Sequence, residues 1–137
     1  MDIRKATLEI ENRVDLLWTH LEVPVSKISQ PFTIPGSPNA WVLLEVLWTT
    51  GFAISVGAPG GNRSRRVGYV NCYGFVPSFT GAGDADYYAG ELASLYERQD
   101  FGGVVCGAAE PGGEARGVDG DWFGRLVAVP FFYDEYT

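Results

Sequence analysis

Few residues in this chain could act as acids, bases or nucleophiles. The single histidine, His20, stands close before Glu22 at the end of an N-terminal segment with helical periodicity, where a cation would complement a helix C-terminus. No serine lies in a G-x-S-x-G turn, and no second histidine is present to activate a serine or a cysteine. We therefore expect a capping or surface role for His20, no catalytic residue and no enzymatic activity.

Two further sets of residues, a pair of cysteines and a pair of aspartates, have side chains of types that bind metal ions in other proteins. Cys72 and Cys106 lack CxxC spacing and lie in apolar, strand-like segments, so buried thiols are the favoured interpretation, with a disulfide or a ligand pair as alternatives. Asp119 and Asp121 flank Gly120 as in part of a calcium loop, but the other ligands and the distal glutamate are missing. We interpret these acids as solvated loop charges and expect no metal and no cofactor.

A glycine-rich turn, TGAGDAD, runs from Thr80 to Asp86 between a strand-like and a helix-like segment. Strand, glycine-rich turn and helix is the order of a nucleotide phosphate loop. Here Asp84 and Asp86 fall in the first helical turn, where their charges would repel a phosphate. The preceding strand also belongs to a predicted hairpin and not to a parallel crossover. We expect this turn to reverse the chain, with Asp84 as the helix N-cap.

Composition limits the classes of partner. The net charge of −7 argues against a protein whose main task is to grip a phosphate backbone, although Arg63, Arg65 and Arg66 are bunched together. A hydrophobic content of 46% is typical of folded proteins. No apolar run reaches the roughly 18 residues of a membrane span, and the N-terminus is too polar for a signal peptide. We expect one domain over residues 1–137, with no membrane contact.

Periodicity predicts the elements that must position these residues. Apolar residues at helical spacing indicate a helix over about 2–20 and a second from 84 onward; the first has the apolar face Ile3, Ile10, Val14, Leu17 and Leu21. Alternating and β-branched runs indicate strands over 41–50, 65–76, 101–109 and 122–136, with a loop over 109–121 and a short edge strand near 25–28. The prediction is an α+β fold: a mainly antiparallel sheet of about four strands, with two helices on one face, in the order α-β-β-α-β-β.

Both faces of two predicted strands are apolar. Residues 42, 44, 46 and 48 point one way, and Trp41, Leu43 and Leu47 point the other way, with Glu45 as the one charge among them. The last strand repeats this pattern, with Phe132 on the second side. Two helices cover one face only, so loops or a neighbouring subunit must cover the other. We favour an oligomer with Trp41, Leu43, Leu47 and Phe132 as interface candidates.

Several motifs together resemble a known family. The strand Arg66–Pro77, RVGYVNCYGFVP, is followed by Gly81-Ala82-Gly83 and an acidic, alanine-rich helix, and the last strand has the form WFxxxVxVPF over Trp122–Phe131. In order and spacing, over nearly the whole chain, this resembles the small tail terminator proteins of long-tailed phages and gene transfer particles. The chain departs from the family pattern at Asn71, Cys72 and Gly74, where hydrophobic residues are usual.

The resemblance implies a structural protein of a virion or phage-like particle, assembled in the host cytoplasm. Such proteins form a ring, typically a hexamer, on the head-proximal end of the tail tube. The ring stops polymerisation of the major tail tube protein, binds the head–tail connector or stopper, and lets DNA pass through its channel. Arg63, Arg65 and Arg66 would then face DNA or pair with acids of the neighbouring subunit, and we favour the pairing.

Three alternatives stay open at this point. The chain could be a head–tail stopper or other neck protein of the same kind of particle, an oligomeric binding domain unrelated to phages, or an enzyme with an unrecognised acid cluster.

Overall fold

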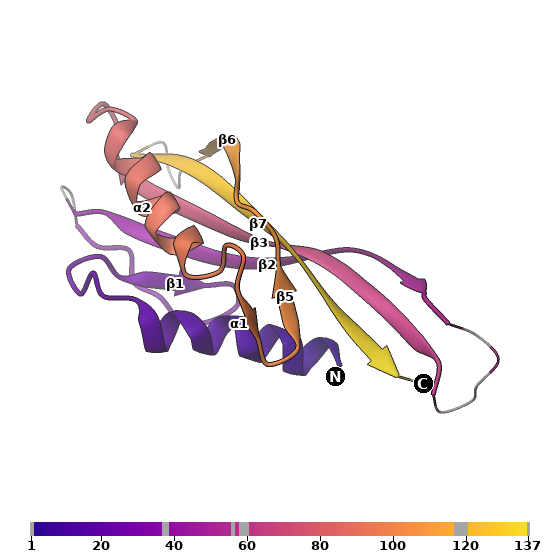
Figure 1. Cartoon of the computed structure of the whole chain (residues 1–137). Helices are drawn as coiled ribbons and strands as arrows, with labels where there is room; N and C mark the ends of the chain where they lie inside the picture. Colours follow the sequence, from indigo (N-terminus) through magenta and orange to yellow (C-terminus); the bar gives the residue numbers. More distant parts are fainter. Residues whose placement is uncertain (1, 37–38, 56, 58–60, 117–120, 137) are drawn as a thin grey trace.

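Three long strands form the centre of the sheet: β2 (Trp41–Ala53), β3 (Arg63–Pro77) and β7 (Trp122–Tyr136). The computed structural model describes residues 2–36, 39–55, 57, 61–116 and 121–136, and Figure 1 shows their arrangement. β2 and β3 form the expected antiparallel hairpin. β3 also pairs with β7 along its whole length, from Arg63 opposite Tyr136 to Pro77 opposite Trp122. The two strands that pair most extensively are therefore far apart in the sequence.

Four short strands extend the sheet: β1 (Val25–Lys27), β4 (Asp100–Phe101), β5 (Val104–Cys106) and β6 (Glu110–Arg116). The strand order is β1-β2-β3-β7-β5-β4, with β6 also paired to β7. β1 runs parallel to β2, whereas the other pairs are antiparallel. The predicted sheet of four strands in the order α-β-β-α-β-β is therefore wrong: the described residues form seven strands in a mixed sheet that curls into a half-barrel.

Glycines explain two of these differences. The expected single strand over 101–109 is a hairpin, because Gly102 and Gly103 have φ of 54° and 86° and make the tight turn between β4 and β5. The expected loop over 109–121 contains β6, whose register shifts between Pro111 and Glu114. Gly112 lies in this irregularity, where a Cβ atom would come within 2.9 Å of the Leu126 side chain. A bulge thus admits Pro-Gly-Gly into a strand.

Pro130 lies inside β7, although proline favours sheet edges. Its carbonyl accepts a 2.8 Å hydrogen bond from the Gly107 N–H, so its nitrogen faces the same side of the strand. On that side the pairing with β6 reaches Ala128, and the pairing with β5 begins at Phe131. The missing N–H therefore falls at the break between two partner strands.

The first helix, α1 (Ile3–Leu17), is capped by Asp2, whose carboxylate accepts a 2.7 Å hydrogen bond from the Lys5 N–H. Its buried face consists of Ala6, Ile10 and Val14. The apolar face predicted from the periodicity is wrong at both ends. Ile3, Leu17 and Leu21 are exposed, and Leu21 lies beyond the end of the helix.

The second helix, α2 (Gly83–Ser94), lies directly on β3. The expectation that Asp84 caps it is wrong, because the N-cap lies two residues earlier, at Ala82, and Asp84 and Asp86 lie in the first turn. Gly74 lets the helix come close. A Cβ atom at this position would collide with the carbonyl oxygen of Ala85 and lie 2.8 Å from the Ala89 nitrogen. Glycine at position 74 thus has a packing reason.

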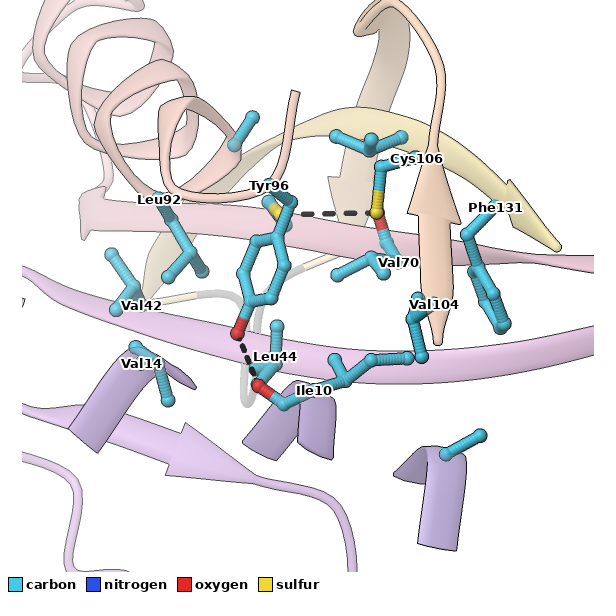
Figure 2. Close-up of a cluster of buried hydrophobic side chains, with 14 of the residues drawn as sticks. Ile10, Val14, Val42, Leu44, Val70, Leu92, Tyr96, Val104, Cys106 and Phe131 are labelled. Atoms are coloured by element: carbon cyan, nitrogen blue, oxygen red, sulfur yellow. Dashed lines mark hydrogen bonds between the residues drawn. The ribbon is translucent and has the colours of Figure 1, made fainter. Parts of the chain in front are cut away.

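Both helices contribute to one core on the same side of the sheet. Figure 2 shows Tyr96, just after α2, with its hydroxyl donating a 2.6 Å hydrogen bond to the carbonyl of Ile10 in α1. Cys72 and Cys106 are buried here as free thiols, which confirms the favoured interpretation. Burial raises the pKa of Cys106 to about 12, so this thiol stays protonated and unreactive at neutral pH.

Candidate assembly interface

The face of the sheet that points away from the helices is called the outer face. It consists of alternate residues of the three central strands, which share an outward direction and little charge: Leu43, Glu45, Leu47, Tyr69, Asn71, Tyr73, Leu126, Ala128, Pro130 and Phe132. Leu47 is 46% exposed, and Leu43 and Phe132 are half-buried. Within the described residues, both helices pack on the core side of the sheet, and the bulge of β6 approaches Leu126.

One end of the outer face is covered by the chain itself. The ring of Trp41 stacks on that of Phe75 with 4.3 Å between the ring centroids. The ring of Phe32, in the proline-rich connector, has its centroid 5.4 Å from that of Trp41. Trp122 meets the Trp41 ring edge-on at 6.1 Å. Trp41 is consequently only 4% exposed. Of the four apolar interface candidates, Trp41 is held within the subunit, whereas Leu43, Leu47 and Phe132 remain accessible.

A polar cluster interrupts the apolar surface. The Oε1 atom of Glu45 accepts hydrogen bonds of 3.0 Å from the Asn71 amide and of 3.0 Å from the Tyr73 hydroxyl. Burial and the neighbouring Glu45 carboxylate raise the pKa of Tyr73 to about 12, so this phenol remains a donor. Asn71 therefore helps to hold the Glu45 carboxylate in a fixed position on the outer face.

An apolar pocket of ≈ 370 Å³ opens on the outer face beside β5 and is here called the outer pocket. Its walls are almost free of polar atoms and are formed by Arg65, Val67, Val105, Cys106, Gly107, Pro130, Phe131 and Phe132. The guanidinium of Arg65 lies 3.9 Å from the centroid of the Phe132 ring and closes one side. A concave apolar surface of this kind accepts an apolar side chain better than a charged ligand.

The three arginines of the sequence motif all contact acids of their own chain. Arg65 binds Asp134 through two hydrogen bonds of 2.9 and 3.2 Å, and Arg66 binds Glu135 at 3.1 Å. The Nε atom of Arg63 lies 3.1 Å from the same Asp134, at an angle that makes no hydrogen bond. The favoured prediction placed the acids that pair with these arginines on a neighbouring subunit. In the structure, the pairing of β3 with β7 supplies such acids from the same chain.

Asp134 makes stability depend on pH. The hydrogen bond from Arg65 lowers the pKa of this carboxyl below its ordinary value, so the folded state favours the ionised form. The resulting stabilisation is present above the unfolded-state pKa of about 3.9 and is lost as pH falls through the folded-state pKa. We expect the urea midpoint of the native chain to fall more steeply between about pH 5 and pH 2 than that of Asp134→Asn. Parallel curves for the two proteins would contradict this assignment.

The groups considered for chemistry are separated in the structure. His20 lies beyond the end of α1, with Nε2 3.1 Å from Glu91 Oε1, and joins the N-terminal segment to α2. Asp119 lies outside the described residues, and the carbonyl of Asp121 accepts a hydrogen bond from the Ser78 N–H. Within the described part of the chain, no three His, Cys, Asp or Glu side chains are grouped to hold a metal ion. No described helix is long and apolar enough to cross a membrane.

Two features of this surface were missed by the sequence analysis. One is the pair of acids Asp134 and Glu135: Asp134 lies directly opposite Arg65, and Glu135 lies diagonally from Arg66, a signal that is readable only once β3 is known to pair with β7. The other feature is Phe79, whose side chain is fully in solvent. A phenylalanine in a Ser-Phe-Thr turn carries no sequence signal for such exposure.

No protein-family model matches the chain, and no curated protein matches it. A solved structure whose designation carries no functional term is similar, with a TM-score of 0.61 and 21% sequence identity. The similarity covers 100% of this chain and 98% of that chain. At this level of identity the likeness shows a shared fold alone.

Proposed function

We propose that this protein is a tail terminator: a structural protein that forms a ring, typically of six copies, on the head-proximal end of a phage or phage-like tail tube. The observation that carries the proposal is the apolar outer face, on which Leu47 is exposed and which the described proline-rich connector covers at its Trp41 end. Burying side chains such as Leu47 and Phe132 against another subunit would contribute about 1.5–3 kcal/mol for each fully buried residue. The motifs in Arg66–Pro77 and Trp122–Phe131 indicate which class of assembly the surface serves.

The ring ends polymerisation of the major tail tube protein and presents its other side to the head–tail connector. Its charge suits a channel through which DNA passes without being held. The net charge is −7, and Arg63, Arg65 and Arg66 contact Asp134 and Glu135 of their own chain. Cations already bound to carboxylates release few counterions from DNA, so its affinity for the protein stays low.

Leu47→Asp tests the proposal. A carboxylate buried in an apolar interface is strongly unfavourable, so we expect subunit association at least about 100-fold weaker and loss of tube capping. Light scattering after gel filtration gives the mass, and electron microscopy gives the length of tubes grown with each variant. Leu16→Asp is the matched control, because Leu16 is 82% exposed on α1, away from the outer face.

Two results would overturn the proposal. One is a native protein that remains monomeric at high concentration and leaves tube length unlimited. The other is an Leu47→Asp variant that assembles and caps tubes as the native chain does.

A further inference from the structure

Phe79 stands out among the apolar side chains of the surface. It is 104% exposed, and its backbone has φ of 69°, the left-handed region that bulky residues rarely adopt. It follows Pro77, at the end of β3, and precedes α2. Both the exposure of the phenyl ring and the backbone conformation are unfavourable in an isolated subunit. Such strain at a surface position is a reason to look for a function.

The turn that carries Phe79 is held in place on both sides. The Ser78 N–H donates a 2.8 Å hydrogen bond to the carbonyl of Asp121. The Thr80 hydroxyl donates a 2.6 Å hydrogen bond to the carbonyl of Pro77. The aromatic ring is therefore presented to solvent on an ordered support, which reduces the entropy lost when a partner binds it. Aromatic residues of this kind are common anchors of protein interfaces.

The outer pocket has the properties needed to receive such a ring. Its volume of ≈ 370 Å³ exceeds the roughly 150 Å³ at which an apolar protein cavity binds benzene. Its walls include the apolar side chains of Val67, Val105 and Phe132. A phenyl ring entering it would meet carbon atoms on several sides and leave no polar group without a partner.

Phe79 and the outer pocket lie at different ends of one sheet. Val67, in the pocket, precedes Pro77 by 10 residues of β3, which corresponds to about 33 Å along an extended strand. The ring of one subunit therefore cannot reach its own pocket. Contact between the two therefore requires two copies of the chain. Repeated head to tail, this contact joins different surfaces of neighbouring copies, and such an interface closes into a ring when the rotation between copies permits it.

Charge favours the same pairing. Asp84 and Asp86 follow the Phe79 turn, in the first turn of α2, and Arg125 pairs with Asp86 at 3.3 Å. Beside the outer pocket, Arg63 and Arg65 both pair with the carboxylate of Asp134, so among the described side chains of this site two cations share one anion. An acidic end meeting a basic end speeds encounter and disfavours the reversed orientation.

We propose that Phe79 of one subunit inserts into the outer pocket of the next and thereby fixes the head-to-tail order of the ring. The proposal rests on the proposed function for the assembly in which it operates. The occupant of the pocket is a second copy of this chain, and Arg63 and Arg65 lie where the acids at the start of the incoming α2 arrive.

Two variants separate the two halves of this contact. Phe79→Asn removes the ring and suits the left-handed backbone, and Val105→Phe fills the pocket from β5. Each variant alone is expected to be monomeric, with association at least about 100-fold weaker than for the native chain. Mixed, they should form a dimer with one copy of each, since only the Val105→Phe chain has the ring and only the Phe79→Asn chain has an open pocket.

Light scattering gives these masses, and circular dichroism checks that each variant is folded. Leu21→Asn is the matched control, because Leu21 is 91% exposed at a site outside the contact and its loss should leave the ring intact. If Val105→Phe fails to fold, Val67→Phe fills the same pocket from β3.

The outcomes distinguish the two proposals. A Phe79→Asn ring of native mass that still caps tubes overturns the inserted-phenylalanine contact and leaves the tail terminator function standing. A mixture that stays monomeric, or that forms rings, also overturns the contact. A native chain that neither assembles nor caps tubes overturns both.

Discussion

Gly74→Ala is expected to lower the free energy of unfolding by about 3 kcal/mol or more, because the added methyl group meets backbone and not a movable side chain. The new Cβ would collide with the Ala85 carbonyl and lie 2.8 Å from the Ala89 nitrogen, so α2 must move away from β3. That movement would also loosen the contacts of Leu92 in the core. Urea denaturation followed by circular dichroism measures the loss.

Gly90→Ala is the matched control for this substitution. Gly90 lies in the same helix, and a Cβ atom there would have nothing within 4 Å. Alanine loses less backbone entropy on folding than glycine, so Gly90→Ala should stabilise the protein by about 0.5–1 kcal/mol. If the two substitutions changed the free energy of unfolding equally, the close approach of α2 would not be the reason why position 74 requires glycine.

Tyr96→Ala is expected to lower the free energy of unfolding by about 3–5 kcal/mol, because it leaves a large cavity at the centre of the core. Tyr96 is 0% exposed, and its hydroxyl links the end of α2 to the carbonyl of Ile10 in α1. Tyr96→Phe keeps the ring and removes the hydrogen bond, for which we expect about 1–2 kcal/mol. The total free energy of unfolding of a domain of this size is about 5–15 kcal/mol, so the alanine variant should be close to unfolding.

Tyr87→Phe controls for the loss of a tyrosine hydrogen bond. The Tyr87 hydroxyl donates to Glu91 at 2.9 Å, but its side chain is exposed and water can replace the bond. We expect a change within about 0.5 kcal/mol, measured in the same urea series. A Tyr96→Phe variant as stable as Tyr87→Phe would mean that Tyr96 acts through ring packing alone.

Local patterns predicted the elements whose signals are local. The helical spacing of Ile10 and Val14 located α1, and the two runs around the loop after Ala53 located the β2–β3 hairpin. The pairing of β3 with β7 left no such signal, because partners such as Val67 and Phe132 are 65 positions apart and either strand looks complete by itself. β6 was hidden by Pro111 and its glycines, which a bulge accommodates.

The candidate interface was predictable from the sequence where it depends on the pattern within one strand, and not where it depends on contacts between distant segments. Apolar residues at alternate positions of β2 and β7 are enough to predict an apolar outer face, and Leu43, Leu47 and Phe132 lie on it. The coverage of Trp41 depends on where Phe32 falls after a proline-rich connector, which periodicity does not specify. The partners of Arg65 and Arg66 depend on the register between β3 and β7, a property of the folded chain.

The place of β7 in the sheet also sets the order of events during synthesis. Until residues 122–136 have been made, β3 has one partner and one bare edge, and Asp134 is not there to bind Arg65. Contacts between residues 45 to 73 positions apart (122 − 77 and 136 − 63) close slowly, on the millisecond-to-second scale expected of sheets with distant partners. The outer pocket is completed by Phe131 and Phe132, so a nascent chain without β7 also lacks this pocket. The proposed ring would therefore accept only chains whose sheet has closed on β7.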